Sequence, residues 1–257
     1  MNHLNVNLPE LPYAVSEAMN RLRVNIKFCG KNTRKIMLTS CQPNEGKSTI
    51  SAYLWKMLAE AGFPTVLVDA DLRKSVMKTR FQMDYDDDTT IGLNHYLSGM
   101  AEYDDVVYKT NIPNGYIVPC TQLLENPSAL LEDVRFKELM NKLAEDYRFV
   151  IIDTPPLGSV SDGALIASLC DGAVLVVRAG TTSRSLIKRS LYDIQQSGCK
   201  LLGTVLNRAD MKGHAYGKYR YGKYGYGYGY GYGYGYGYEP ENKKTAAGSK
   251  SHSTSGK

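Results

Sequence analysis

The sequence predicts an α/β fold in which a parallel β-sheet is sandwiched between helices. Two observations predict it. Short apolar runs alternate with amphipathic stretches of helical periodicity between residues 36 and 206, which is typical of βαβ units. The apolar runs show no polar alternation, which indicates strands buried on both faces of the sheet. In such sheets ligands bind beyond the carboxyl ends of the strands, so residues at those ends are the first candidates for a functional site.

The expected elements follow from periodicity and from residues that end a helix. After the first strand, apolar residues recur at helical spacing until Gly62 ends the helix. The apolar runs predict strands over 36–40, 65–69, 116–119, 149–153, 173–177 and 201–206. The periodic stretches predict helices over 47–61, 92–97, 161–169 and 184–197, and one or two helices over 128–146. Asp162, after Ser161, is expected to cap the helix that follows it.

Charge divides the chain of 257 residues into two parts. Residues 213–257 contain seven Lys or Arg and two Glu, and their net charge of +5 equals that of the whole chain. Residues 1–212 are therefore neutral, and we expect one globular catalytic domain there, followed by a disordered tail over 213–257. A neutral domain argues against nucleic acid as a partner, because domains that bind nucleic acid are usually basic.

The cysteines and the apolar runs indicate where the protein works. Five cysteines lie far apart without a C-x-x-C pair, which indicates a reducing, cytoplasmic environment and no zinc site. The N-terminus has no signal-peptide pattern, and no apolar run approaches the roughly 18 residues of a membrane span. We therefore expect a cytoplasmic protein that reaches a membrane only through a partner.

The first strand leads into the segment CQPNEGKST, residues 41–49, which has the parts of a phosphate-binding P-loop. Such a loop needs backbone N–H groups around the phosphate, a lysine for the β- and γ-oxygens and a hydroxyl for Mg²⁺. Lys47 and Ser48 supply the last two, and the following helix directs its positive N-terminus at the anion. Cys41 stands where the strict pattern has its first glycine. The expected nucleotide-binding residues here are Glu45, Gly46, Lys47, Ser48 and Thr49.

Two further strands end in carboxylates. Asp153 follows four apolar residues, as a Walker-B acid does, and Asp69 and Asp71 are separated by one residue. If the strand stays extended there, Asp69 and Asp71 point to the same side and can act together. Beside bound ATP, one carboxylate can hold metal while another accepts the proton of an incoming hydroxyl. The expected catalytic residues are Lys47, Asp69, Asp71 and Asp153, and the expected Mg²⁺ ligands are Ser48, Asp71 and Asp153. Helix caps or loop aspartates are the alternative interpretation.

Asn207 and Arg208 close the last strand, at the same edge of the sheet. We expect them to hydrogen-bond the edge of the adenine of a bound nucleotide. A plain turn fits the pair as well.

The C-terminal part contains a ladder of tyrosines that alternate strictly with glycine from Tyr224 onward. Glycine at every other position makes ordering costly, so the segment is expected to be flexible. A flexible chain of about 26 residues spans roughly 28 Å and at most about 90 Å, which permits delivery of a tyrosine to its own site or to a neighbour's. The candidate phosphate acceptors are Tyr216, Tyr219, Tyr221, Tyr224, Tyr226, Tyr228, Tyr230, Tyr232, Tyr234, Tyr236 and Tyr238. The alternative is a low-complexity tail that self-associates or stacks on nucleic acid.

These motifs, NEGKST at 44–49, LVDADLRK at 67–74 and IIDTPP at 151–156, together with the tyrosine cluster, resemble the bacterial tyrosine kinases of capsule and exopolysaccharide synthesis. The resemblance spans residues 13–238 and implies a P-loop NTPase fold related to the septum-placement ATPase MinD and the partitioning ATPase ParA. It also implies ATP and Mg²⁺ as cofactors and autophosphorylation of the tyrosine cluster. The family's N-terminal assembly helix carries Glu, Arg and Arg at three-residue spacing. Glu17 and Arg23 match that pattern, but Asn20 replaces the first Arg.

The same resemblance implies partners. They are a separate transmembrane activator of the polysaccharide co-polymerase type, further copies of the chain in a ring, and a cognate protein-tyrosine phosphatase. Two other functions fit the motifs. One is a partitioning-type P-loop ATPase without phosphoryl transfer to protein, and the other is a non-enzymatic scaffold gated by ATP.

Overall fold

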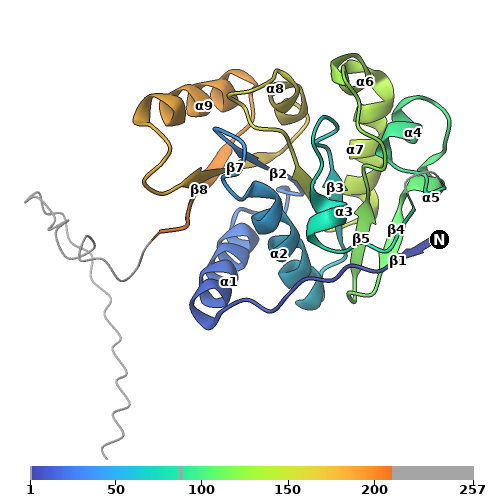
Figure 1. Ribbon diagram of the computed structural model, residues 1–257, viewed down its shortest axis with the longest axis horizontal. Helices are drawn as coiled ribbons and strands as arrows, with labels where there is room; N and C mark the ends of the chain where they lie inside the picture. Colours follow the sequence, from blue (N-terminus) through green and yellow to red (C-terminus); the bar gives the residue numbers. More distant parts are fainter. Residues whose placement is uncertain (1, 87–88, 210–257) are drawn as a thin grey trace, which may run out of the picture. The chain divides into compact units, whose positions relative to one another are not determined.

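Eight strands form one sheet in the computed structural model, which describes residues 2–86 and 89–209. Their order across the sheet is β1-β4-β5-β3-β6-β2-β7-β8 (Figure 1). The strands are β1 (Asn2–Leu4), β2 (Lys35–Ser40), β3 (Thr65–Asp69), β4 (Tyr108–Thr110), β5 (Gly115–Val118), β6 (Phe149–Asp153), β7 (Gly172–Arg178) and β8 (Leu201–Asn207). All neighbouring strands are parallel except β4 and β5. The predicted parallel sheet is therefore confirmed, with one antiparallel pair that the sequence did not indicate.

The helices connect these strands. They are α1 (Tyr13–Phe28), α2 (Lys47–Glu60), α3 (Met77–Arg80), α4 (Leu93–Leu97), α5 (Tyr103–Val106), α6 (Ser128–Glu132), α7 (Val134–Asp146), α8 (Asp162–Ala167) and α9 (Arg184–Gln196). The stretch 128–146 forms two helices because Asp133 adopts an extended conformation between them. Its side chain then caps α7 by accepting a hydrogen bond from the Arg135 N–H at 2.9 Å.

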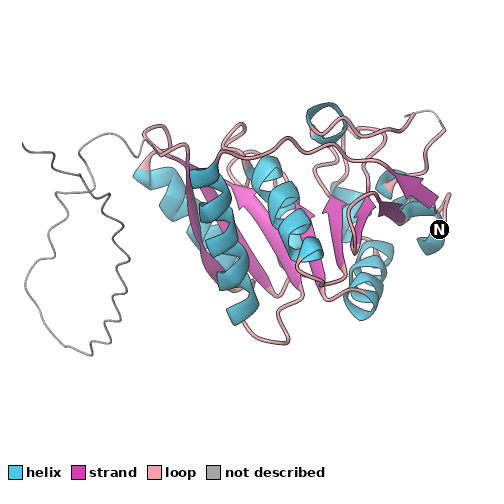
Figure 2. Cartoon of the chain, turned by 90° about the horizontal axis from the view of Figure 1, so that it is seen from below, coloured by secondary structure: helices cyan, strands magenta, loops and turns pink. Residues whose placement is uncertain are grey.

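Two hydrophobic cores lie on opposite faces of the sheet. Helices cover both faces of the sheet (Figure 2). Ile36 and Leu38 of β2 pack with α1, α2 and α3, whereas Met37 between them packs with the helices of the other face. This alternation explains why the central strands are apolar throughout. β8 is the exception, because it is an edge strand, and Leu201 and Leu206 are exposed.

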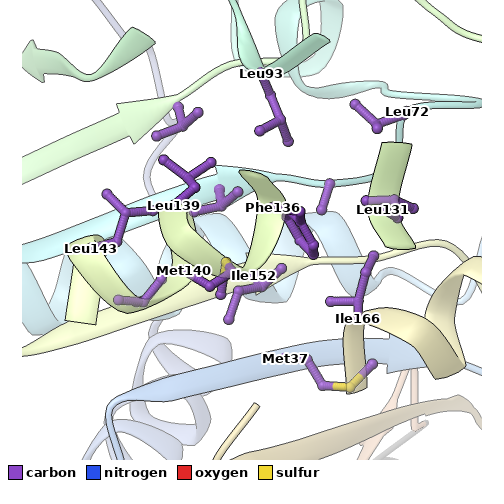
Figure 3. Close-up of a cluster of buried hydrophobic side chains, with 14 of the residues drawn as sticks. Met37, Leu72, Leu93, Leu131, Phe136, Leu139, Met140, Leu143, Ile152 and Ile166 are labelled. Carbon is purple, nitrogen blue, oxygen red and sulfur yellow. The ribbon is translucent and has the colours of Figure 1, made fainter. Parts of the chain in front are cut away.

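α7 covers part of the second face through an apolar stripe. Its buried residues recur at helical spacing and lie over the sheet beside Ile152 (Figure 3); they are Phe136, Leu139, Met140 and Leu143. Full burial of each such side chain contributes roughly 1.5–3 kcal/mol. The stripe therefore holds β6, and with it the strand end that carries Asp153.

α2 lies between α1 and the sheet, so most of its residues are buried. Trp55 is fully buried there, and its indole N–H donates to the Thr65 carbonyl at 3.1 Å. This tryptophan therefore fills the core between α2 and the sheet. Because α2 is packed on both sides, the phosphate loop at its N-terminus has a firm support.

The predicted tail over 213–257, with its eleven tyrosines, lies outside the described residues, and the domain boundary after residue 212 stays a prediction. Within residues 2–86 and 89–209, no helix is both long enough and apolar enough to cross a lipid bilayer.

Candidate active site

The carboxyl ends of three neighbouring strands bring the predicted site residues together. β6 lies between β3 and β2, and Asp69 and Asp153 are Cα partners at the ends of β3 and β6. β2 continues directly into the phosphate loop, residues 41–48, and Lys47 is the first residue of α2. Asp71 lies just beyond β3. The four residues expected to be catalytic therefore lie in one cluster.

The phosphate loop turns by means of two left-handed residues. Asn44 has a φ of 64°, and Gly46 has a φ of 98° at the N-cap of α2. Cys41, which replaces the first glycine of the pattern, does not have a positive φ. The departure from the pattern at Cys41 is therefore compatible with this loop, because the backbone there requires no glycine.

Lys47 points from the start of α2 toward the carboxylates. Its Nζ lies 2.8 Å from Asp71 Oδ2 and 3.4 Å from Asp153 Oδ2, and it donates to Ser48 Oγ at 3.3 Å. Burial lowers the pKa of Lys47, but the charges of Asp153 and Asp71 outweigh burial and hold this pKa above its ordinary value. Lys47 is therefore a fixed positive charge among acids.

Asp69 and Asp153 are each only 1% exposed. Burial, with the neighbouring charge of Asp153, raises the pKa of Asp69 to about 8. Burial also raises the pKa of Asp153, although Lys47 and Ser48 oppose the shift. Asp69 Oδ2 accepts a hydrogen bond from Ser75, whereas Asp69 Oδ1 is buried without a partner among the described residues. Three carboxylates thus lie near one lysine. This excess of acidic groups favours the binding of a proton or a cation.

The residues fit Mg²⁺ of the kind that accompanies a nucleotide. In the described part of the chain, no three His, Cys, Asp or Glu side chains form a complete metal site by themselves. Mg²⁺ at nucleotide sites takes most of its ligands from phosphates and water and only one or two from protein. Ser48 beside an excess of carboxylates, with the unpartnered oxygen of Asp69, matches that requirement.

Two further hydroxyls on the first turns of α2 take part in the cluster or border it. Ser51 Oγ lies 2.9 Å from Asp153 Oδ1 and 2.9 Å from the Lys47 carbonyl. Thr49 accepts a hydrogen bond from Arg80 at 3.2 Å, and its expected contact with nucleotide stays a prediction. Sequence analysis missed Ser51, although its position one turn after Lys47 on a buried helix was a usable signal.

A cavity of about 220 Å³ opens beside Lys47 and the phosphate loop. Pro155 and Pro156 line another part of its wall. Asp71 lines the cavity, but Asp69 and Asp153 do not. Of these three carboxylates, a molecule in the cavity would therefore contact Asp71.

Asn207 lies against the phosphate loop. Its side-chain amide donates to the Glu45 carbonyl at 2.8 Å, and its Oδ1 accepts from the Arg208 N–H at 2.9 Å. A Cβ on Gly46 would lie 2.1 Å from Asn207 Nδ2, so only glycine fits at that position. Arg208 is exposed and has a φ of 55°. The expected contact of Asn207 and Arg208 with adenine stays a prediction.

Arg73 forms a second charged cluster that the sequence did not indicate. It makes an ion pair with Asp162, whose Oδ1 lies 3.2 Å from Arg73 Nη2 and 2.6 Å from Ser128 Oγ. Burial raises the pKa of Asp162, but the bonds from Arg73 and Ser128 outweigh burial and hold this pKa below its ordinary value. The expected helix cap at Asp162 is wrong: Ser161 occupies the N-cap position, and the carboxylate of Asp162 is bound by Arg73 instead.

The N-terminal helix α1 carries the residues that resemble an assembly motif. Arg23 donates to Asn20 Oδ1 from Nε at 3.0 Å and from Nη2 at 2.7 Å. Glu17 is half-buried, and Arg21 is exposed. The replacement at Asn20 therefore supplies an acceptor that holds Arg23 along the helix.

Comparison with known proteins places this geometry in a family. The profile of the family described as AAA domain matches residues 33–196. A protein named tyrosine-protein kinase CpsD, from Streptococcus agalactiae, is 42% identical over 208 residues, which cover 80% of this chain and 90% of that protein.

Solved structures show the same fold. The crystal structure of the chimerical protein CapA2B2 superposes with a TM-score of 0.72 at 32% identity and covers 80% of this chain and 92% of that one. The septum site-determining protein MinD from Pyrococcus horikoshii OT3, complexed with Mg-ADP, has a TM-score of 0.56 at 25% identity. That match covers 67% of this chain and 69% of that one.

Proposed function

The chain belongs to the bacterial tyrosine-protein kinases, which carry an AAA-type ATPase domain, and from this premise we propose that it transfers the terminal phosphoryl group of ATP to tyrosines of its own C-terminal segment. The family membership inferred from the motifs is thereby confirmed. One observation carries the proposal: Lys47 lies between Asp71 and Asp153 beside a cavity that the phosphate loop borders.

Lys47 has two roles in this proposal. Its Nζ is bound by Asp71 and Asp153, which keeps a buried positive charge in place. A phosphate in the loop would offer the same Nζ further charged acceptors, and Asp71 would then be free to face the cavity. Ser48, Asp71 and Asp153 would hold Mg²⁺, which neutralises phosphate charge when it is bound.

Asp71 is the group that we assign to remove the proton from the acceptor. Tyrosine titrates near pH 10, so its hydroxyl must lose the proton during transfer. Asp71 lines the cavity, whereas Asp69 does not, and burial raises the pKa of Asp69 to about 8. A carboxylate has two oxygens, so Asp71 can face the metal with one and the acceptor with the other.

The acceptors are the eleven tyrosines of the segment 213–257, which lies outside the described residues. β8 ends at Asn207, whose side chain touches the phosphate loop, so the chain leaves the domain beside the candidate site. The contact between the end of β8 and the phosphate loop supports transfer to this segment, on the same or a neighbouring copy.

Incubation of the purified chain with γ-labelled ATP and Mg²⁺ tests the proposal. Label on tyrosine is expected, and deletion of residues 213–257 should abolish it. Phosphate release without labelled protein would indicate a partitioning-type ATPase instead. Binding of ATP with neither product would indicate a scaffold.

We further propose a cytoplasmic kinase that a separate transmembrane activator recruits to the membrane in capsule or exopolysaccharide synthesis, with a tyrosine phosphatase that reverses the modification. The family relationship supports this proposal. Labelling with and without the cytosolic segment of a candidate membrane partner tests it, since an activator should increase the rate.

The chain is also proposed to assemble as a ring, as the resemblance of α1 implies. Each phosphate adds about −1.5 to −2 charges, so roughly three phosphates would cancel the +5 of the tail. A phosphorylated tail would then be repelled by the acidic cluster of a neighbour. The size of the protein in solution should therefore fall after treatment with ATP, and an unchanged size would contradict this part.

A further inference from the structure

A buried carboxylate lies inside the phosphate loop itself. Glu45 is 3% exposed and stands between the two left-handed residues Asn44 and Gly46. Its Oε2 accepts hydrogen bonds from the backbone N–H groups of Cys41 at 2.7 Å and Gln42 at 3.0 Å. The side chain thus ties the end of the loop back to its beginning.

The other oxygen of this carboxylate is bound from a distant segment. Glu45 Oε1 accepts a hydrogen bond from the hydroxyl of Thr182, which lies in the loop between β7 and α9. The Thr182 N–H donates to the Arg178 carbonyl at 3.4 Å, which places the residue near the end of β7. Asn207 holds the backbone carbonyl of Glu45 at the same time. Three segments that are far apart in sequence therefore meet at Glu45.

All these donors are neutral, and together they satisfy both oxygens of a buried charge. Neither Glu45 nor Thr182 lines the cavity, so neither is placed to touch a phosphate there. Their bonds fix the path of a loop whose N–H groups must already point inward when the nucleotide arrives. A loop that is ordered in advance binds more tightly, because less conformational entropy is lost on binding.

We propose that Glu45 and Thr182 form a clamp that holds the phosphate loop in its binding shape, and that both are positioning residues. The inference rests on nucleotide binding, which is one part of the proposed function. Because the clamp acts before any chemistry, its loss should weaken the binding of nucleotide and leave the rate at saturating ATP nearly unchanged.

The test compares Thr182→Val, Thr182→Ser and Thr181→Val in the full-length chain. Valine has the shape of threonine without the hydroxyl, and serine keeps the hydroxyl. Thr181 is an exposed neighbour whose hydroxyl donates to the Ala179 carbonyl at 3.4 Å. Thr182→Val should weaken Mg-ADP binding, measured by calorimetry, and raise the KM for ATP, each by about ten-fold, which corresponds to about 1.4 kcal/mol. The kcat should stay within two-fold. Thr182→Ser and Thr181→Val should bind as the wild type does.

A double-variant cycle separates the clamp from a general structural effect. Glu45→Met keeps the length of the side chain but removes both acceptor oxygens, whereas the amide of Glu45→Gln could still donate to Thr182 Oγ, whose proton can go to the Arg178 carbonyl at 3.2 Å. Glu45→Met should therefore weaken Mg-ADP binding at least as much as Thr182→Val. The pair Glu45→Met and Thr182→Val should then cost clearly less than the sum of the two single variants. Full additivity, or wild-type binding by Thr182→Val, would overturn the clamp. A wild-type protein that binds Mg-ADP but labels no tyrosine would overturn the proposed function alone, and the ADP titrations would still decide the clamp.

Discussion

Two clusters of charged side chains lie beside the same cavity, which Lys47 and Arg73 both line. They differ in the ratio of acidic to basic groups. In the first, Lys47 makes ion pairs with Asp71 and Asp153, whereas Asp69 Oδ1 has no partner among the described residues. In the second, Asp162 alone is held by Arg73 and Ser128. The pKa of Asp69 is raised to about 8, whereas the pKa of Asp162 lies below its ordinary value.

The difference separates a reactive cluster from a structural one. A carboxylate whose bonds are complete stays ionised and ties segments together, as Asp162 ties Arg73, after β3, to Ser128, the first residue of α6. A cluster with more acids than bases is unstable until a proton or a cation joins it, and a site for Mg²⁺ and phosphate needs that property. Mutations in the Lys47 cluster should therefore lower tyrosine labelling most, whereas mutations in the Asp162 cluster should mainly lower stability.

The largest effect is expected from Lys47→Met. Loss of the lysine removes the positive charge that meets the phosphoryl group, so tyrosine labelling should fall about 10³-fold. The measurement is incorporation of label from γ-labelled ATP, with circular dichroism to check the fold. Labelling within ten-fold of the wild type would show that the Lys47 cluster is structural as well.

Asp71→Asn should lower labelling about 10²-fold, because the variant cannot accept the proton of the acceptor. Binding of Mg-ADP needs no proton transfer, and the amide keeps one oxygen that can face Mg²⁺, so this binding should weaken by much less, at most about ten-fold. Calorimetry and labelling on the same preparation compare the two losses. If binding of Mg-ADP falls as far as labelling does, Asp71 acts only through the metal and is not the group that accepts the proton.

Asp69→Asn should change how stability depends on pH. The folded pKa of Asp69, about 8, lies above its unfolded value near 4, so the folded state holds a proton that the unfolded state releases. The stability that this proton confers is complete below pH 4 and is lost as the pH rises toward 8. Between pH 5 and pH 7 the wild type should therefore lose about 2 kcal/mol of unfolding free energy relative to the variant.

Urea unfolding at several pH values checks the Asp69 prediction. The other groups titrate in both proteins, so the difference between the two isolates Asp69. A constant difference across the pH range would mean that Asp69 is ionised in the folded protein, and the contrast between the two clusters would lose its main support.

The smallest effect is expected from Asp162→Asn. The amide keeps one acceptor for Arg73 but loses the charge, and Arg73 is partly exposed to water, so the unfolding free energy should fall by about 1 kcal/mol. Labelling by the folded variant should stay within a few-fold. A loss comparable to that of Asp71→Asn would place the Asp162 cluster in the reaction.

The sequence predicted which residues meet but not how they share charge. The motifs at Lys47, Asp69 and Asp153 follow three apolar strands, and parallel strands deliver their ends to one edge of a sheet, so the cluster was predictable. The difference between Asp69 and Asp71 was not, because it depends on which carboxylate the side chains around β3 leave open to the cavity.

Contacts between distant segments were beyond prediction for the same reason. Arg73 and Asp162 are 89 residues apart, and Asp162 was assigned to its own helix because local patterns favour caps after Ser161. The clamp of Thr182 on Glu45 joins residues 137 apart, in a loop without any motif. The short strands β1 and β4 were also missed, since three residues carry too little periodicity to be recognised.

Trp55 has a practical consequence. It is the chain's one tryptophan, it is fully buried, and it lies on α2, the helix that follows the phosphate loop. Its indole emission should shift to longer wavelength when α2 leaves the sheet and water reaches the ring. The helix that follows the phosphate loop therefore carries an intrinsic fluorophore, and unlabelled protein is enough to follow the unfolding of α2 by spectroscopy.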